Sequence, residues 1–375
     1  MTLYAGLLSG TSMDGVDAVL LSTDDGRFAV RAATHTDYPA ALRTELLDVV
    51  ADPARCDLDR FGVLDVAIGR VFAEAAATLF AQAGVAPEAV RAIGSHGQTL
   101  LHRPRQSHPF TLQAGDPHQI AEALGVDVVA DFRRRDMAAG GEAAPLAPGF
   151  HAAVFGSSQE DRAVANLGGI ANITWLPASG TVTGFDTGPA NCLMDLWAQR
   201  HLGTEYDRDG AFAASGHVDA ALLARLMDEP YLALPGPKST GRELFRMPWL
   251  EARLATLPPL APADVQATLC EYSAVTLCDA LVASGNNGRP PARLLACGGG
   301  AYNRRLMERI AARLPTTLVE STAAHGIPPK QVEGALFAWL AWCFVEGRAG
   351  NLPAVTGARA ARPLGTLCRG RVTKP

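Results

Sequence analysis

Each half of the chain opens with two apolar segments joined by a turn of glycine and small polar residues. In the first half, Leu3 to Leu21 contains the turn "GTSMDGVD" at Gly10 to Asp17. In the second half, "RAVANLGGIANITWL" at residues 162–176 has the same form. Apolar runs around glycine and aspartate are typical of a β-hairpin, because these residues tolerate the backbone of a tight turn. This weak internal repeat predicts an α/β protein with two similar lobes.

The rest of the chain alternates strands and helices. Helices are predicted for residues 40–50, 64–83 and 263–284, where alanine and leucine recur at helical spacing. "VRAIGSHGQTLLH" is predicted to be a strand that ends in a glycine-rich loop. "TVTGFDTGPANCLMDLWAQ" is predicted to be a strand, a glycine-rich turn and a helix. A glycine- and proline-rich segment at residues 136–148 indicates a linker between the lobes.

Charge and cysteine content argue against several classes of protein. The chain has 375 residues and a net charge of −5, so binding to nucleic acid is not expected. Its seven cysteines include no Cys-x-x-Cys pair, which favours reduced thiols over disulfides or a zinc site. The N-terminus lacks a signal-peptide pattern, and the longest apolar run, Ala335 to Val345, is too short to span a bilayer. We therefore expect a cytoplasmic protein that does not contact membranes.

Three glycine-rich turns are candidates for phosphate binding. They lie at Gly10–Gly15, Gly184–Asn191 and Gly298–Asn303, the last two before a predicted helix. Glycines let backbone N–H groups approach an anion, and a helix N-terminus favours negative charge. The alternative is that these glycines only permit close packing of strand and helix. Neither a Gly-x-x-x-x-Gly-Lys-Ser/Thr loop nor a Gly-x-Gly-x-x-Gly strand–turn–helix motif occurs, which disfavours P-loop and dinucleotide-binding folds.

Three aspartates are candidates for chemistry. Asp186 follows the apolar stretch "TVTGF", and a carboxylate at the end of a strand points into the ligand crevice of an open α/β sheet. It could act as a general base, or it could cap the helix that follows. Asp14 and Asp17 could hold Mg²⁺ together with phosphate oxygens, or they could simply form the turn.

Other charged side chains indicate an anionic or polyhydroxylated ligand. Arg133 begins a run of three arginines, and arginine pairs bidentately with carboxylates. The alternative for this run is ion pairing with Asp131 or Asp136. Glu333 begins a predicted apolar helix, where it could face a ligand or only complement the helix dipole.

A series of sequence blocks resembles the anhydro-N-acetylmuramic acid kinase family. In chain order they are "GLLSGTSMDGVDAVL", "GSHGQTLLHRP", "DFRRRDMAAGGEAAPLAP", "NLGGIANITWL", "GFDTGPANCLMD", "GPKSTGRELF", "CGGGAYNRRLM" and "LPAVTGA". They cover essentially the whole chain. Two departures stand out: the family's usual "GGQGAPL" is "GGEAAPL" here, at Glu142 and Ala143, and its usual Glu-Ala at the late helix is Glu333-Gly334.

The resemblance implies the fold of sugar kinases, actin and actin-like chaperones, in which two ribonuclease H-like lobes close over ATP. The N-terminal lobe would be residues 1–135, completed by 355–375, and the C-terminal lobe residues 136–354. The cofactors would be ATP and Mg²⁺, with Asp14 as the candidate metal ligand. The residues implied in ATP binding are Gly10, Thr11, Ser12, Met13, Asp14, Gly15, Val16, Asp17, Gly168, Gly169, Thr187, Gly188, Gly298, Gly299, Gly300 and Asn303.

The implied reaction opens the 1,6-anhydro ring of the sugar with water and phosphorylates the freed O6. Asp186 would take a proton from the water that attacks the anomeric carbon, while O6 attacks the γ-phosphate. The products would be N-acetylmuramic acid 6-phosphate and ADP, in the recycling of cell-wall murein by a homodimer. The sugar would contact Ser95, His96, Gln98, Arg133 and Glu333, with Arg133 on the lactyl carboxylate.

Two other activities remain open from the sequence. Another sugar kinase of the same fold would phosphorylate a different sugar. An actin-like or chaperone-like ATPase would hydrolyse ATP without any sugar.

Overall fold

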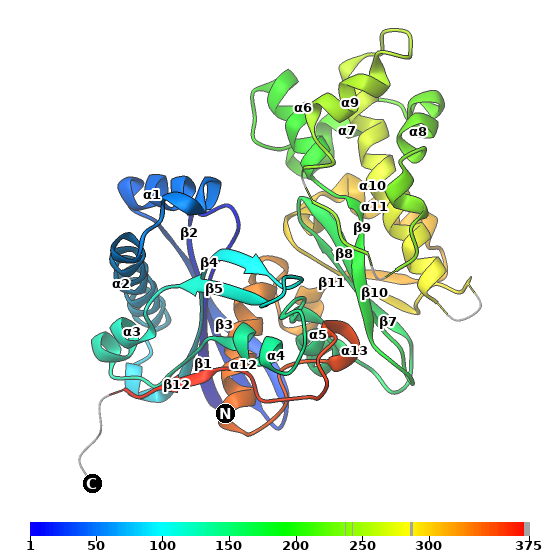
Figure 1. The fold of residues 1–375 in the computed structure, drawn as a ribbon. Helices are drawn as coiled ribbons and strands as arrows, with labels where there is room; N and C mark the ends of the chain where they lie inside the picture. The colour runs from blue at the N-terminus through cyan, green and yellow to red at the C-terminus, as the bar shows by residue number, and fades with distance from the viewer. Residues whose placement is uncertain (237, 242, 286–287, 371–375) are drawn as a thin grey trace. The chain divides into compact units, whose positions relative to one another are not determined.

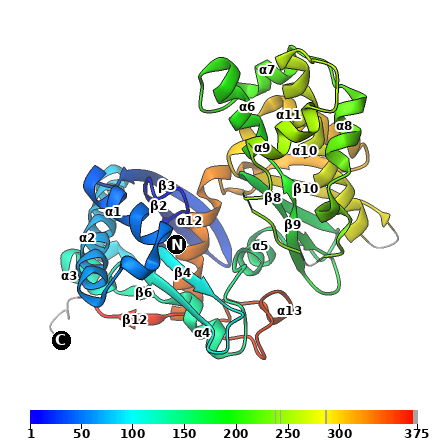
Figure 2. The ribbon, with the colours of Figure 1, turned by 45° about the horizontal axis from the view of Figure 1, so that its top comes forward.

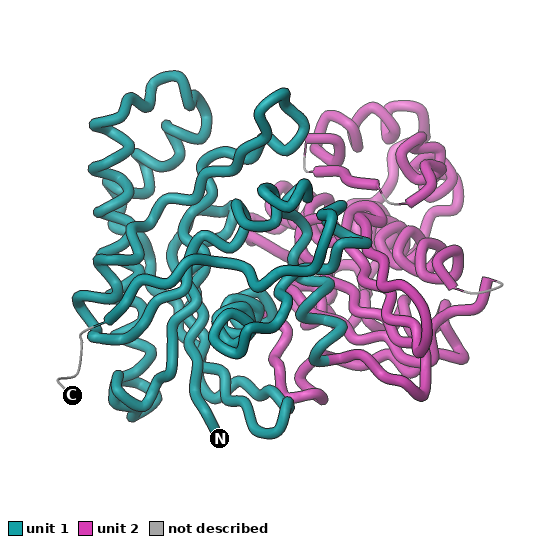
Figure 3. The backbone as a smooth tube through the Cα atoms, turned by 60° about the horizontal axis from the view of Figure 1, so that its bottom comes forward, with its two compact units in different colours: residues 1–154, 331–375 teal, residues 155–330 magenta. Residues whose placement is uncertain are grey.

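The computed structural model describes residues 1–236, 238–241, 243–285 and 288–370, in two compact units. Unit 1 comprises residues 1–154 and 331–375, and unit 2 comprises residues 155–330 (Figure 3). These boundaries differ from those of the predicted lobes, because 136–154 and 331–354 group with the N-terminal segment. The reason is packing: helix α12 (Val332–Val345) lies against strands of unit 1.

Unit 1 is built on one mixed sheet with the strand order β12-β6-β4-β1-β2-β3 (Figure 1). The first three strands form an antiparallel meander, β4 runs parallel to β1, and β6 runs parallel to β4. Strand β12 pairs antiparallel with β6, and β5 pairs antiparallel with β4. The strands are β1 (Thr2–Ser9), β2 (Gly15–Asp24), β3 (Arg27–Asp37), β4 (Val90–Arg103), β5 (Phe110–Ala114), β6 (Val128–Ala130) and β12 (Thr366–Cys368).

Helices cover both faces of this sheet. On one face, α1 (Ala40–Ala51), α2 (Leu58–Ala83) and α3 (Pro117–Leu124) form a hydrophobic core with the strands, and α12 covers the other face (Figure 2). Side chains alternate along a strand, so Ala5 and Leu7 join the core under α2, whereas Gly6 between them faces α12. The remaining helices of this part of the chain are α4 (Phe132–Ala138), α5 (Ala147–Phe155) and α13 (Pro353–Thr356).

Unit 2 has a five-stranded sheet in the order β11-β10-β7-β8-β9. Its strands are β7 (Arg162–Leu167), β8 (Ile170–Leu176), β9 (Thr183–Pro189), β10 (Arg293–Cys297) and β11 (Leu318–Ser321). Its longest helix, α10 (Pro262–Ser284), contributes many buried residues to the core beside the sheet. The other α-helices described there are α6 (Cys192–Leu202), α7 (Ala211–Ala214), α8 (Ala220–Met227), α9 (Met247–Leu254) and α11 (Arg304–Arg313).

The two sheets share one topology. In both, an antiparallel three-stranded meander is extended by two parallel strands, in the orders β6-β4-β1-β2-β3 and β11-β10-β7-β8-β9. The prediction of an α/β protein with two similar halves is therefore confirmed, as are the helices predicted at 40–50, 64–83 and 263–284.

Two predicted turns are strand instead. Strand β4 continues through Gly97 to Arg103, because β5 pairs with its second half. Strand β9 continues to Pro189, because Pro189 pairs with Ile170 of β8. The predictions of a glycine-rich loop at the end of "VRAIGSHGQTLLH" and of a glycine-rich turn after "TVTGF" were therefore wrong.

The apolar run Ala335 to Val345 forms most of α12 and is largely buried. Across the described residues, every helix is too short or too polar to cross a bilayer.

Candidate functional site

The turn between β1 and β2 presents small polar side chains to solvent. Thr11, Ser12 and Asp14 are exposed, and the Ser12 hydroxyl donates to Asp14 Oδ1 at 2.8 Å. The Met13 N–H closes the turn by donating to the Gly10 carbonyl at 3.2 Å. Met13 has a φ of 49°, a conformation rare for a residue with a side chain. Backbone and hydroxyl donors of the turn are thus accessible.

Other residues of this predicted phosphate turn have structural roles. The side chains of Met13 and Val16 are buried in the core of unit 1, so only their backbones could meet a ligand. A Cβ at Gly15 would lie 2.3 Å from the Thr36 carbonyl oxygen, which explains the glycine. Asp17 forms an ion pair with His35 at 2.7 Å.

A buried histidine and an arginine form the centre of the predicted sugar-binding group. Arg133 Nε donates to His96 Nε2 at 2.8 Å, and His96 Nδ1 lies 2.9 Å from the Gly97 carbonyl oxygen. Because arginine can only donate, Nε2 accepts and Nδ1 carries the proton. Burial, and then the charge of Arg133, hold the pKa of His96 well below its usual range, so the ring is neutral. Phe337 of α12 packs on it with ring centroids 4.5 Å apart.

The same arginine is held from a second side. Its Nη1 donates to the Ala143 carbonyl at 2.7 Å. Desolvation lowers the pKa of the Arg133 guanidinium to about 10, against the opposing effect of Glu333 and Asp136, so it stays charged at neutral pH. Two of its three nitrogens are thereby fixed. The third, Nη2, has no hydrogen-bond partner among the described residues and is available to a ligand.

The other three predicted sugar contacts differ in their surroundings. Gln98 Oε1 accepts from the Ser9 hydroxyl at 2.6 Å, which ties β4 to the end of β1. The Ser95 hydroxyl is buried and has no hydrogen-bond partner among the described residues. Glu333 is exposed at the start of α12. Partial desolvation and the negative charge of Asp17 raise the pKa of its carboxyl, and the positive charge of Arg133 opposes this rise.

A fully buried carboxylate organises the segment that holds Arg133. Asp136 Oδ1 accepts from Asn351 Nδ2 at 2.6 Å and from the Thr356 hydroxyl at 2.9 Å, and Oδ2 accepts from the Ala143 N–H at 2.8 Å. The alternative of an ion pair between Arg133 and Asp136 is not what the structure shows, because the donors to this carboxylate are uncharged.

In unit 2, Asp186 is held by the polar loop that follows α8. Its carboxylate Oδ2 accepts from the Thr240 N–H at 3.0 Å and the Ser239 hydroxyl at 3.2 Å, and its own N–H donates to the Lys238 carbonyl at 3.1 Å. Desolvation raises the pKa of this carboxyl, and the bonds from Thr240 and Ser239 partly oppose the rise. The Tyr231 hydroxyl fixes the Asp186 carbonyl at 2.7 Å.

The structure distinguishes the two roles left open for Asp186. Helix α6 begins at Cys192 and its N-cap is Asn191, five residues after Asp186. Asp186 is instead a residue of β9, in register with Asn172 of β8. It therefore caps no helix, and its half-buried, oriented carboxylate is suited to accept a proton.

The glycines near Asp186 connect strands to α6. The Asn191 and Ala190 N–H groups donate to the Gly168 and Gly169 carbonyls, each at 3.0 Å, so the turn between β7 and β8 is tied to the helix start. Thr187 is buried and its hydroxyl donates to the Ala171 carbonyl at 3.4 Å. These contacts are those expected if the glycines serve close packing of strand and helix, which was the alternative to phosphate binding at this turn.

The third glycine turn borders a pocket of about 680 Å³ within unit 2. Gly298 has a φ of 78°, Gly300 is buried, and Asn303 caps α11 by accepting from the Leu306 N–H at 3.0 Å. Of the residues in the predicted glycine-rich turns, Asn191, Gly299, Tyr302 and Asn303 line the pocket. The lining residues outside these turns are Asp195, Glu205, Tyr206, Asp207, Arg208, Asp209 and Lys330. The available signal in the sequence was the polar stretch "DRDG" at residues 207–210, in which aspartate and glycine are typical of a turn.

Comparison with known proteins places the whole chain in one family. Residues 2–370 match the family model described as anhydro-N-acetylmuramic acid kinase. The chain belongs to the anhydro-N-acetylmuramic acid kinase family. It is 52% identical over 368 residues to the family member of Xanthomonas campestris pv. campestris, covering 97% of each chain. It is 51% identical over 373 residues to that of Xylella fastidiosa, covering 97% of this chain and 96% of that one.

Among solved structures, the chain is similar to the activator of the 2-hydroxyisocaproyl-CoA dehydratase from Clostridium difficile. The TM-score is 0.48 at 11% identity, covering 92% of this chain and 96% of that chain.

The two departures from the usual pattern of the anhydro-N-acetylmuramic acid kinase family have local consequences. Ala143, where the usual residue is glycine, has a φ of 60°, a left-handed conformation that glycine adopts more easily. Gly334, where the usual residue is alanine, faces Val19, and a Cβ there would lie 2.4 Å from Val19 Cγ2. Glu142 pairs with Arg105 at 3.0 Å on the surface.

Proposed function

We propose that this chain is an ATP-dependent kinase that hydrolytically opens 1,6-anhydro-N-acetylmuramic acid and phosphorylates its O6. The products are N-acetylmuramic acid 6-phosphate and ADP, and the role is murein recycling. The family membership over residues 2–370 supports the substrate and the reaction class. The observation that carries the mechanism is the orientation of Asp186 by Ser239 and Thr240.

The residues present suit a nucleotide. Gly299 has no side chain to obstruct the pocket of unit 2, and the neighbouring Asn303, Tyr302 and Lys330 offer an amide, a ring and a cation. The exposed hydroxyls of Thr11 and Ser12 suit phosphate oxygens. Asp14 would hold Mg²⁺ together with those oxygens, and the bound ion would neutralise phosphate charge.

Asp186 acts as the general base. Its Oδ2 is occupied by Thr240 and Ser239, which leaves Oδ1 to accept the proton of a water. That water attacks the anomeric carbon, the bond from this carbon to O6 breaks, and the electron pair stays on O6. O6 then attacks the γ-phosphate and ADP leaves. The raised pKa of Asp186 makes its carboxylate a better base.

Arg133 binds the lactyl carboxylate of the sugar through Nη2. His96 and the Ala143 carbonyl fix the guanidinium, so little side-chain entropy is lost when the sugar binds. Glu333, Ser95 and Gln98 complete the sugar contacts, and the buried Ser95 hydroxyl donates when the sugar is bound.

The decisive experiment measures ADP release with Mg-ATP and 1,6-anhydro-N-acetylmuramic acid. Asp186→Asn should reduce the rate by about 10²–10⁴-fold, the usual effect of losing a general base, with ATP affinity unchanged. Asp228→Asn, at an exposed carboxylate of the same unit, is the matched control and should keep the wild-type rate.

Other outcomes would decide between the alternatives. Turnover of a different sugar, with no reaction of the anhydro sugar, would support the kinase activity and refute the proposed substrate. ATP hydrolysis that is equally fast with and without sugar would favour an actin-like ATPase. Full activity of Asp186→Asn would refute the mechanism.

We also propose that the enzyme works in the cytoplasm as a homodimer. ATP is available there, and the cysteine pattern suits a reducing compartment. Light scattering on the purified chain would measure the oligomeric state.

A further inference from the structure

The basic run "RRRD" separates into residues with different surroundings. Arg133 is fixed by His96 and Ala143, as described above. Arg134 Nη2 pairs with Asp131 at 2.7 Å. Arg135 does neither: its exposed side chain borders a small cavity on α4. Residues two apart on a helix point in nearly opposite directions, so this cavity is separate from the surroundings of Arg133.

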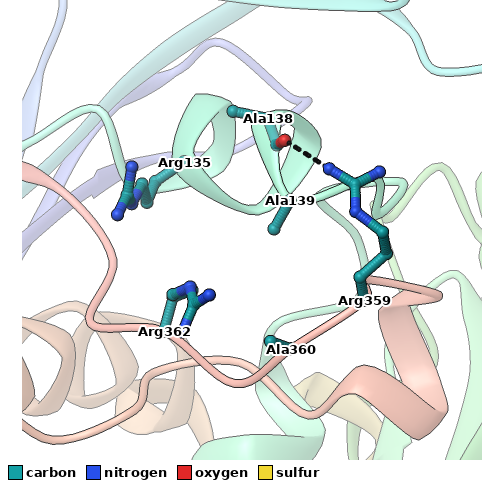
Figure 4. A pocket seen from close by; sticks show the side chains of 6 residues that line it. All are labelled: Arg135, Ala138, Ala139, Arg359, Ala360 and Arg362. Atoms are coloured by element: carbon teal, nitrogen blue, oxygen red, sulfur yellow. Dashed lines mark hydrogen bonds between the residues drawn. The ribbon is translucent and has the colours of Figure 1, made fainter.

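The cavity has a volume of about 240 Å³ and lies between α4 and the segment 359–362 (Figure 4). Its lining residues are Arg135, Ala138, Ala139, Arg359, Ala360 and Arg362. In Figure 4, Arg135 from the helix and Arg362 from the facing segment lie on one side of the space, and Arg359 lies on the other. Every charged residue of the lining is therefore an arginine.

These positive charges are not balanced within the chain. In the ranges that the structure describes, none of the three guanidinium groups pairs with a carboxylate. The acidic residues in and shortly after α4 are engaged elsewhere: Asp136 with uncharged donors, and Glu142 with Arg105. Like charges around one cavity repel one another, and a bound anion would remove that repulsion.

Helix stabilisation explains only part of this arrangement. Arg359 Nη2 donates to the Ala138 carbonyl at 3.2 Å, and its N–H donates to the Ala139 carbonyl at 2.8 Å. A cation at a helix C-terminus is favourable, which accounts for Arg359. Arg135 and Arg362 make no such contact with the end of α4 in the described residues, so their position at the cavity needs another reason.

We propose that this cavity is a second ligand site, which binds the phosphate group of a small soluble molecule. Arginine donates to phosphate oxygens with paired, parallel hydrogen bonds, and three arginines can surround a phosphate dianion from different sides. The volume accommodates a phosphate with a few further atoms. The site does not depend on the proposed kinase activity.

The experiment titrates the full chain with inorganic phosphate by calorimetry. The test variant is the double substitution Arg135→Gln and Arg362→Gln, both at exposed side chains. Arg134→Gln is the matched control, because it removes a charge from the same helix outside the cavity. Wild type and control should bind phosphate equally in the millimolar range, and the double variant about tenfold or more weakly. Arg362→Lys, which keeps the charge and loses the paired donors, should be intermediate.

Three outcomes would overturn the proposal. One is wild type that does not bind phosphate at millimolar concentration. Another is a double variant that binds as tightly as wild type, which would place the phosphate elsewhere, for example at the glycine turns. The third is arginine-dependent binding to phosphatidylglycerol vesicles without binding of free phosphate, which would assign the cavity to a lipid headgroup.

Discussion

Replacing Gly6 by alanine should force α12 away from the sheet of unit 1. A Cβ at Gly6 would lie 2.0 Å from the Gly334 carbonyl oxygen and 2.5 Å from the Ala338 nitrogen. Ordinary van der Waals contact begins at 3.4 Å, so the helix has to move by more than 1 Å. Both atoms belong to the backbone, so no rotation of a side chain can relieve the clash.

The expected cost is about 3 kcal/mol or more, at the upper end for overpacking of a core, because the obstacle is a rigid helix. Urea unfolding of the full chain, followed by tryptophan fluorescence, measures it. Trp342 of α12 packs edge-on against Phe28 of β3 with ring centroids 5.0 Å apart, so its emission reports on this interface. The midpoint of the transition of unit 1 should fall.

Gly62→Ala is the matched control. Gly62 lies in α2 with nothing within 4 Å of an added Cβ, so alanine should stabilise the helix by up to about 1 kcal/mol. Gly6→Ala should also raise the KM for the sugar, because Glu333 precedes the displaced Gly334. A Gly6→Ala variant with the wild-type midpoint, or a Gly62→Ala variant that loses as much stability, would refute the packing argument.

Three further predictions concern pH, catalysis and the buried carboxylate. Burial lowers the pKa of His151 to about 3 from 6.5, so the native state rejects a proton that the unfolded chain accepts. Between these two pH values, His151 should make the free energy of unfolding fall by about 1.4 kcal/mol for each pH unit by which the pH is lowered. Unfolding measured at a series of pH values should show a smaller slope in His151→Gln and the wild-type slope in the control His217→Gln. Ser239→Ala should move the acidic limb of kcat to higher pH, because it removes a hydrogen bond that lowers the pKa of the proposed base, Asp186. Thr240→Ala should leave the limb in place, since Thr240 donates its backbone N–H. Asp136→Asn should destabilise the chain by about 2–4 kcal/mol in urea unfolding, because its amide nitrogen cannot accept from the donors that surround it.

Much of the fold could be predicted because its signals are local. The hairpins of β1–β2 and β7–β8 are encoded by glycine turns between apolar runs, and α2 and α10 by helical spacing. The loop predicted within "VRAIGSHGQTLLH" and the turn predicted after "TVTGF" were wrong because β5 and β8 extend the pairing of β4 and β9. Hydrogen bonding to the adjacent strand of a hairpin outweighs the local preference of glycine for turns.

Prediction of the candidate site is also limited, because contacts between residues far apart in the chain shape it. Asp186 could be selected from "GFDTGPAN" alone, but the loop that orients its carboxylate lies more than 50 residues later in the chain. The unit boundary was missed for the same reason. The segment 331–354 joins unit 1 through contacts of α12 with β1 and β4, which no local pattern encodes.

The proposed phosphate site and Arg133, the proposed contact of the sugar, are connected through one segment. Arg362 donates its N–H to Asn351 Oδ1 at 2.8 Å, and Asn351 donates to Asp136. Asp136 in turn holds the Ala143 N–H, and the Ala143 carbonyl fixes Arg133. A phosphate that orders Arg362 should therefore favour the arrangement in which Arg133 binds the sugar, and linkage requires the sugar to favour phosphate equally. Calorimetry of each ligand with the other present measures both sides of this cycle. Identical affinities in all combinations would show that the two sites are uncoupled, even if both exist.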